Sequence, residues 1–165
     1  MNWYVLQTLS YKTDGLITLL NRYDDIDAFT PLMEYFHTRD KRVYKKPLFK
    51  GYIFVKTHLD QAGFHNLINC MENKDGIVRE LKYEENTSAL TNQEIDLFEH
   101  ILDDQNVVRV SQACLQNGRA KIIYGPLKEY EMNIIKYDKH NLMAYLDISF
   151  YDRPIKAALM IVNEE

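Results

Sequence analysis

The chain has 165 residues, of which 46% are hydrophobic and 27% are charged, and this balance excludes a wholly disordered protein. The formal net charge of −4 argues against a protein that coats nucleic acid with basic charge over its whole surface. No apolar run approaches the roughly 18 residues of a membrane helix, and the N-terminal segment lacks the basic head of a secretory signal. We therefore expect a cytoplasmic protein without membrane contact. Cys70 and Cys114 have no Cys or His at metal-ligand spacing, which predicts no metal site and two buried, reduced thiols.

The first part of the chain alternates between strand and helix patterns. Aromatic and β-branched residues predict a strand over Trp3–Leu9, and Thr13 or Asp14 can cap the helix that follows. An apolar run over residues 28–36 predicts another strand. Pro31 lies inside that run and indicates an edge strand or a bulge.

A basic segment follows, and it leads into the strongest strand pattern of the chain. Residues 37–46 are polar and basic, which is typical of the exposed tip of a β-hairpin. Residues 47–56 then predict a strand. Because side chains alternate along a strand, Tyr52, Phe54 and the neighbouring lysines are expected together on the exposed face, and Ile53 and Val55 on the other.

Two more helices and a strand complete this half. Asp60 is placed to cap a second helix, residues 77–83 predict a short strand, and Thr91 with Glu94 fits a capping box at the start of a third helix. This order predicts an α+β sandwich, an antiparallel sheet with helices on one face, over residues 1–104. We place the linker near residues 103–107.

The character of the sequence changes after this linker. Five short strand patterns separated by turn signals predict a small all-β barrel over residues 105–165.

Three motifs now stand in the same order as in a known family. The segment Pro-Leu-Phe-Lys-Gly-Tyr-Ile-Phe-Val at residues 47–55 resembles the signature strand of NusG-type transcription factors, and Trp3–Gln7 resembles their first strand. Gly125-Pro126-Leu127, with Tyr130 after it, resembles the KOW module that ends these proteins. The resemblance implies an NGN-like N-terminal domain, an SH3-like KOW barrel, and a factor that binds RNA polymerase and promotes processive elongation or antitermination. Lys50 replaces the usual proline and Met132 replaces the usual glycine, which favours a specialised paralog of the RfaH, LoaP or UpxY kind that acts at specific operons.

The resemblance also implies where partners bind. An apolar patch on the N-terminal domain receives the clamp helices of the largest polymerase subunit in this family, and the matching residues are Phe49, Tyr52 and Phe54, with Trp3 beside them. Intramolecular cover of these rings is the alternative interpretation.

The basic hairpin is the candidate nucleic-acid site. Basic side chains with an aromatic ring among them suit contacts to phosphates and stacking on single-stranded bases, which in this family means non-template DNA or nascent RNA. A solvated hairpin whose lysines protect a sheet edge is the alternative. The candidate residues are Arg39, Lys41, Arg42, Tyr44, Lys45 and Lys46.

Leu127 and Tyr130 lie in the segment that matches the partner-binding loop of the KOW module, where ribosomal protein S10 is the expected partner. We expect a monomer without a cofactor. An enzyme is not expected, because no phosphate-binding glycine loop, zinc-protease motif or nucleophile elbow is present. A ribosome-associated or translation-linked KOW protein remains the alternative, although the acidic net charge is unusual for a binder of ribosomal RNA.

Overall fold

The structure is a computed structural model, and it describes residues 1–84, 87 and 89–164. The chain folds into two compact units. The first unit is residues 1–31 with 49–95, and the second is residues 32–48 with 96–165. The predicted basic hairpin thus belongs to the same unit as the C-terminal strands.

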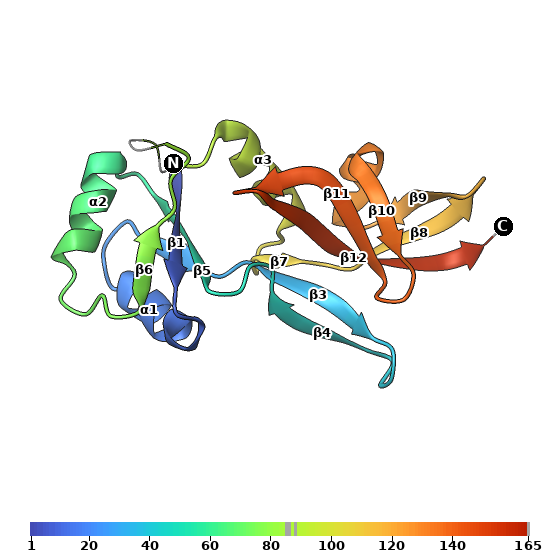
Figure 1. Cartoon of the computed structure of the whole chain (residues 1–165), viewed down its shortest axis with the longest axis horizontal. Coiled ribbons are helices and arrows are strands. Elements are labelled where there is room, and N and C mark those ends of the chain that lie inside the picture. The colour runs from blue at the N-terminus through green and yellow to red at the C-terminus, as the bar shows by residue number, and fades with distance from the viewer. Residues whose placement is uncertain (85–86, 88, 165) are drawn as a thin grey trace. The chain divides into compact units, whose positions relative to one another are not determined.

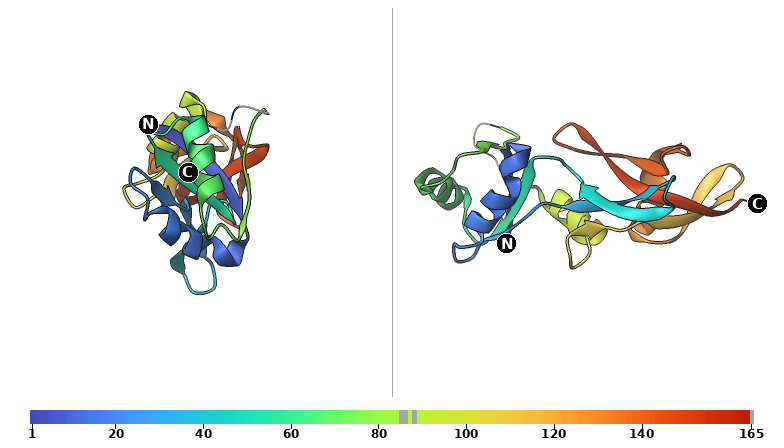
Figure 2. Two further views of the ribbon diagram at one scale, coloured as in Figure 1. Left: turned by 90° about the vertical axis from the view of Figure 1, so that its left-hand side faces the viewer. Right: turned by 90° about the horizontal axis from the view of Figure 1, so that it is seen from below.

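The first unit contains a four-stranded sheet with helices on one face (Figure 1). The strand order is β2-β5-β1-β6, and every pairing is antiparallel. In the left view of Figure 2, α1 and α2 lie in front of this sheet. The elements are β1 (Asn2–Thr8), η1 (Ser10–Lys12), α1 (Thr13–Leu20), β2 (Asp27–Phe29), β5 (Tyr52–Thr57), α2 (Gln61–Cys70) and β6 (Ile77–Glu80).

Two of the three predicted helix caps are confirmed. The cap predicted at Thr13 or Asp14 is wrong, because α1 already begins at Thr13 and its N-cap residue, Lys12, makes no side-chain capping hydrogen bond. The carboxylate of Asp60 accepts a hydrogen bond of 2.8 Å from the backbone N–H of Gly63 at the start of α2. Thr91 and Glu94 exchange backbone and side-chain hydrogen bonds at the start of α3 (Asn92–Ile101). At both helix starts these hydrogen bonds satisfy backbone N–H groups that have no partner within the helix. The local sequence therefore determines where these two helices begin.

The main core of the first unit lies between the sheet and its helices. Tyr4 of β1 stacks on Phe64 of α2 with 4.2 Å between ring centroids, and Ile53 and Val55 of β5 are buried beside them. The alternation predicted along β5 is confirmed, because Tyr52 and Phe54 are buried but do not belong to this core cluster. They lie on the opposite face of the sheet, as predicted, but the prediction that they are exposed is wrong, because both rings are buried.

Pro31 separates two strands that enter different sheets, and this differs from the single strand predicted over residues 28–36. β2 ends at Phe29 and pairs with β5, whereas β3 (Leu32–His37) pairs with β4 (Arg42–Pro47). Proline has no N–H to donate to a sheet, and the chain changes partner at that residue.

The second unit is mainly β-structure, and the predicted all-β C-terminal region is confirmed. A five-stranded sheet has the order β10-β11-β12-β8-β9, and its edge strands β9 and β10 are not paired with each other in the part of the chain that is described. The sheet is thus a half-barrel. Its elements are β8 (Ser111–Gln116), β9 (Arg119–Tyr124), η2 (Pro126–Asn133), β10 (Ile134–Asp138), β11 (Met143–Phe150) and β12 (Arg153–Glu164).

A second, three-stranded sheet has the order β4-β3-β7. β7 (Val107–Val108) lies parallel to β3, and the N–H of Leu32 donates to the carbonyl of Asn106 at 2.9 Å. The hairpin and the segment predicted as a linker are therefore paired with each other.

The two cysteines differ from the prediction that both are buried. Cys70 is exposed at the end of α2, and Cys114 is half-buried on β8; both are free thiols. Among the described residues, none of the helices has the length and apolarity that a membrane crossing requires.

Candidate functional site

The four residues predicted to contact polymerase lie together on one face of the first sheet. Phe54 is central: its ring centroid is 6.5 Å from that of Trp3 and 6.3 Å from that of Phe49, with which it stacks at an interplanar angle of 3°. The ring centroid of Tyr52 lies 6.1 Å from that of Phe49. Phe29 of β2 completes the group at 5.9 Å from both Trp3 and Phe54, although no sequence motif singled it out. We call these five residues the aromatic cluster.

All five rings of the aromatic cluster are buried in the full chain. The ammonium group of Lys56 lies over two of them, 4.5 Å from the ring centroid of Trp3 and 4.8 Å from that of Phe29. A cation over an aromatic face is attracted by the electron density of the ring. The cluster therefore combines a packed aromatic surface with a positive charge at its margin.

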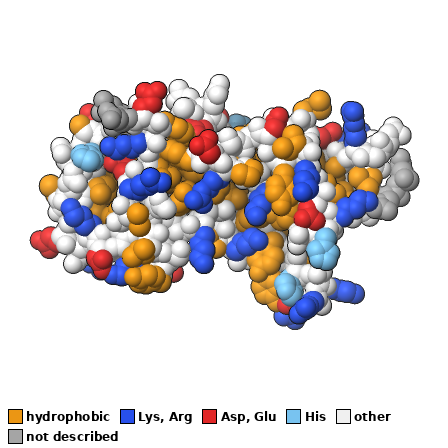
Figure 3. Space-filling model, viewed as in Figure 1, with side chains coloured by type: hydrophobic (Ala, Val, Ile, Leu, Met, Phe, Trp, Pro, Cys, Tyr) orange, Lys and Arg blue, Asp and Glu red, His pale blue; other side chains and the backbone are white. Residues whose placement is uncertain are grey.

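The basic hairpin presents two different faces. In the β3–β4 register, Tyr35 pairs with Tyr44, and His37 pairs with Arg42. Since side chains alternate along a strand, these four residues and Lys46 share one face, whereas Lys45 lies on the other, opposite Glu34. Figure 3 shows Lys and Arg side chains gathered at the free end of the hairpin, with hydrophobic side chains along it.

The structure thus brings together Arg42, Tyr44 and Lys46 of the predicted nucleic-acid site. It separates Lys45 from them and leaves Arg39 and Lys41 at the turn between the strands. Tyr35 is an additional ring on the same face, 6.0 Å from Tyr44 between centroids. The signal that could have found Tyr35 is its position directly opposite Tyr44 in a hairpin.

Asp40 organises the hairpin tip. Its carboxylate accepts a hydrogen bond of 2.7 Å from the hydroxyl of Tyr44 and lies 2.5 Å from Nδ1 of His37. These two hydrogen bonds, that from Tyr44 first, hold the pKa of Asp40 below its ordinary value despite an opposing effect of burial. The acid at the tip is therefore paired within the hairpin, and it fixes the orientation of two rings.

The loop that resembles the KOW partner site, together with the start of β10, has one buried apolar residue and two exposed ones. Leu127 is only 1% exposed and belongs to the core, whereas Tyr130 is half-buried, and burial raises the pKa of its hydroxyl. Met132 is 91% exposed and Ile135 is 67% exposed. Met132 lies within η2 and is not among the described residues with positive φ, so the loop accommodates methionine without strain there.

Steric constraints explain why glycine stands at two positions of the family-like motifs, Gly51 and Gly125. Gly51 has φ of +78°, and an added Cβ would lie 2.8 Å from the carbonyl oxygen of Thr8. Gly125 has φ of +104°, and an added Cβ would lie 2.6 Å from the α-carbon of Ser111. Both positions require a residue without a side chain. The motifs that carry the resemblance are thus turns that the fold itself needs.

Comparisons with known proteins agree with this geometry. A family model described as "NusG: Transcription termination factor nusG" matches residues 1–99, more than half of the chain. The chain belongs to the NusG family. The predicted family is therefore confirmed, and the protein is a transcription elongation factor in the general sense of that family, whose members are not enzymes.

A solved structure shows the same fold as this NusG-family chain. NusG from Thermotoga maritima, solved in a study of its domain interaction, is similar with a TM-score of 0.56 and 15% identity, over 96% of this chain and 93% of that one. The MjSpt4:Spt5 complex in conformation B gives a TM-score of 0.35 at 13% identity, over 94% and 91% of the two chains. The fold comparison therefore rests on the Thermotoga protein. Among curated proteins, none matches the sequence significantly.

Nothing in the described part of this NusG-family chain assembles a metal centre, because no three His, Cys, Asp or Glu side chains there form a group that could hold an ion. Its candidate functional sites are the aromatic cluster, the hairpin face and the loop at η2. Sites of this kind, which combine aromatic rings with cations, suit binding to macromolecules.

Proposed function

We propose that this NusG-family protein docks on RNA polymerase through the aromatic cluster and promotes processive elongation and antitermination at specific operons. Membership of the family is the observation that carries the proposal. The cluster supports it, because large rings such as Trp3 and Phe54 are typical anchors where an apolar helix pair docks on a groove. The clamp helices of the largest polymerase subunit are the proposed partner.

The proposed mechanism is mechanical. A factor that bridges the polymerase cleft favours the closed clamp and disfavours the paused state, and the size of the shift is limited by its difference in affinity for the two states. Because the rings of the cluster are buried in the full chain, docking on them requires that they become accessible first. That step lowers the apparent affinity by the fraction of molecules in which the rings are accessible.

The hairpin is proposed to contact nucleic acid at the transcription complex. Arg42, Tyr44 and Lys46 supply cations and a ring on one face, and this combination suits single-stranded DNA or RNA. Lys50 and Met132 replace residues that are usual in the family motifs. Together with these replacements, the basic hairpin supports a specialised role at particular operons.

The half-barrel is proposed to bind a second protein, with ribosomal protein S10 as the candidate. Tyr130 and the exposed Met132 and Ile135 offer apolar surface for such a contact. Leu127 supports this surface from within the core. The proposed domain boundary stays at residues 103–107, and the proposed state is a cytoplasmic monomer.

Binding to purified core RNA polymerase tests the docking proposal. We would compare the wild-type chain with the double variant Tyr52→Leu/Phe54→Leu, which keeps apolar side chains at the two buried positions and limits the loss of packing. Tyr4→Leu is the matched control, because Tyr4 is an equally buried ring on the helix-covered face of the same sheet. Circular dichroism and thermal unfolding verify that each variant is folded.

The proposal predicts that the wild type and Tyr4→Leu bind and that the double variant does not. Equal binding of all three proteins would show that the aromatic cluster is not the docking surface. No binding of the wild type would contradict the polymerase proposal and favour the translation-linked alternative, to be tested with ribosomes and S10. Terminator read-through on templates with different leaders then measures antitermination and its operon specificity.

A further inference from the structure

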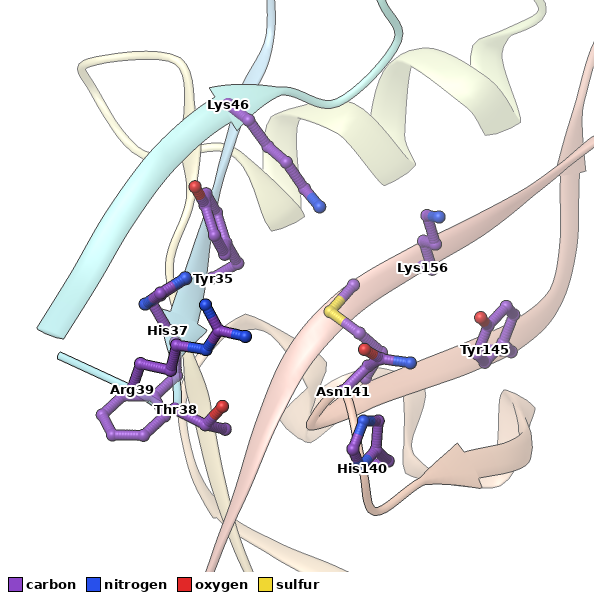
Figure 4. A pocket seen from close by; sticks show the side chains of 11 residues that line it. Tyr35, His37, Thr38, Arg39, Lys46, His140, Asn141, Tyr145 and Lys156 are labelled. Atoms are coloured by element: carbon purple, nitrogen blue, oxygen red, sulfur yellow. The ribbon is translucent and has the colours of Figure 1, made fainter. Parts of the chain in front are cut away.

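An open groove lies within the second unit, between the β3–β4 hairpin and the strands β11 and β12. Its volume is about 580 Å³, within the range of ligand-binding pockets. One wall comes from residues 35–39 and Lys46 of the hairpin. The other comes from the half-barrel and is formed by His140, Asn141, Met143, Tyr145 and Lys156. Figure 4 shows the side chains of the two walls facing the space between them.

The charged side chains that line the groove are all positive. They are Arg39, Lys46 and Lys156, and none of the described residues that line the groove is Asp or Glu. Burial lowers the pKa of Lys46, and the neighbouring positive charge of Lys156 lowers it further. Two ammonium groups that repel each other across a groove are stabilised by an anion between them. The groove is therefore complementary to a negatively charged ligand.

The groove also carries a ring on each wall. Tyr35 lies on the hairpin wall, with the ammonium of Lys46 4.7 Å from its ring centroid. Tyr145 lies on the half-barrel wall, with the ammonium of Lys136 5.4 Å from its ring centroid. Both rings are half-buried, so one part of each packs against the protein and another part stays accessible. Rings combined with cations are the usual platform for nucleic-acid bases and phosphates.

We propose that this groove binds a short segment of single-stranded nucleic acid, with a phosphate between Lys46 and Lys156 and bases stacked on Tyr35 and Tyr145. The proposal rests on the nucleic-acid contact proposed for the hairpin and extends it to the half-barrel. Its new content is that residues of the C-terminal strands, above all Lys156 and Tyr145, form half of the binding site. An acidic peptide would satisfy the lysines but would leave the two rings without a planar partner.

The test measures binding of the full-length chain to fluorescently labelled single strands of about 12 nucleotides, a typical site size. DNA and RNA of the same sequence form two arms, and anisotropy is followed over a series of salt concentrations. Lys156→Gln removes one phosphate contact. Since each contact on a single strand contributes about 0.7 to the salt slope, we expect affinity to fall about eightfold at about 0.05 M salt and the slope to decrease by about 0.7.

Two further variants separate charge from stacking. Tyr145→Leu is expected to weaken binding about tenfold with an unchanged salt slope, because stacking releases no counterions. Lys121→Gln is the matched control, since Lys121 is an exposed lysine of β9 that does not line the groove. It is expected to bind like the wild type apart from a small nonspecific loss.

Binding that depends on Lys156 and Tyr145 supports the proposal, and the arm with the higher affinity identifies RNA or DNA as the ligand. Equal affinities of Lys156→Gln and Lys121→Gln would overturn it, as would the absence of binding by the wild type to both strands. Loss of binding only in the tip variant Lys41→Gln/Arg42→Gln would overturn the groove while keeping the hairpin contact. The assay contains no polymerase, so its result is independent of the docking experiment.

Discussion

The guanidinium of Arg109 donates a hydrogen bond of 2.8 Å to the carboxylate of Glu34, a residue 75 positions earlier in the chain. The same guanidinium also donates to Asp103 and Gln105, and the second carboxylate oxygen of Glu34 accepts from the N–H of Val110 at 3.0 Å. Arg109 thereby joins strand β3 of the hairpin to the segment before the half-barrel. The contact stabilises the three-stranded sheet β4-β3-β7 at the point where β7 pairs with β3.

Replacing Arg109 by methionine should destabilise the second unit. The variant keeps much of the length of the side chain but leaves the Glu34 and Asp103 carboxylates without their shared donor. We expect a lower urea midpoint than that of the wild type, measured by circular dichroism. Arg119→Met is the control, because Arg119 is an exposed arginine at the start of β9. Equal midpoints for the two variants would show that the contacts of Arg109 add nothing to stability.

The stability of the protein should depend on Glu34 at acid pH. Burial tends to raise the pKa of Glu34, but hydrogen bonds from Arg109 and Val110 outweigh it and hold the pKa below the ordinary value of 4.5. A carboxyl whose pKa is lower in the folded state stabilises the fold above its unfolded pKa. That stabilisation is lost as pH falls through the folded pKa.

The measurement is the melting temperature of the wild type and of Glu34→Gln as pH is lowered from about 7 to about 3. We expect the difference between the two proteins to be largest near neutral pH and to shrink below the ordinary pKa of glutamate. A difference that stays constant across this range would contradict the assignment of the low pKa to Glu34.

Gly51 and Gly15 should respond in opposite directions to alanine. At Gly51, φ is +78° and an added Cβ would lie 2.8 Å from the carbonyl oxygen of Thr8, so we expect Gly51→Ala to lower the free energy of unfolding by about 1–3 kcal/mol. Gly15 lies in α1 with no atom within 4 Å of an added Cβ, and Gly15→Ala should raise that free energy by about 0.5–1 kcal/mol. Urea unfolding measures both. An unchanged free energy of unfolding for Gly51→Ala would show that the turn can relax to accept a side chain.

The local elements could be read from neighbouring residues. The cap at Asp60 and the capping box of Thr91 and Glu94 were predicted because both ends of each hydrogen bond lie within four residues. The alternation of Tyr52 and Phe54 with Ile53 and Val55 was predicted for the same reason, since period 2 is a property of a single strand. The motifs around Gly51 and Gly125 identified the family correctly.

Other features were not readable in this way. The prediction that both thiols are buried was wrong, because Cys70 lies on the exposed side of the last turn of α2 despite its apolar neighbours in sequence. The apolar run over residues 28–36 does not reveal that the chain changes sheets at Pro31. Burial and strand pairing are decided by which segments meet in space.

The sequence by itself therefore determined most of the helices and strands, the caps at Asp60 and Thr91, the turn at Gly125 and the family. Only the tertiary structure decided that the hairpin of β3 and β4 pairs with β7, that Glu34 meets Arg109, and that Lys46 faces Lys156 across a groove. The physical reason is the distance along the chain over which each interaction acts. Caps, turns and alternation depend on hydrogen bonds and side-chain directions within a few residues. Contacts between residues 75 or more positions apart depend on the packing of whole segments, which no short pattern encodes.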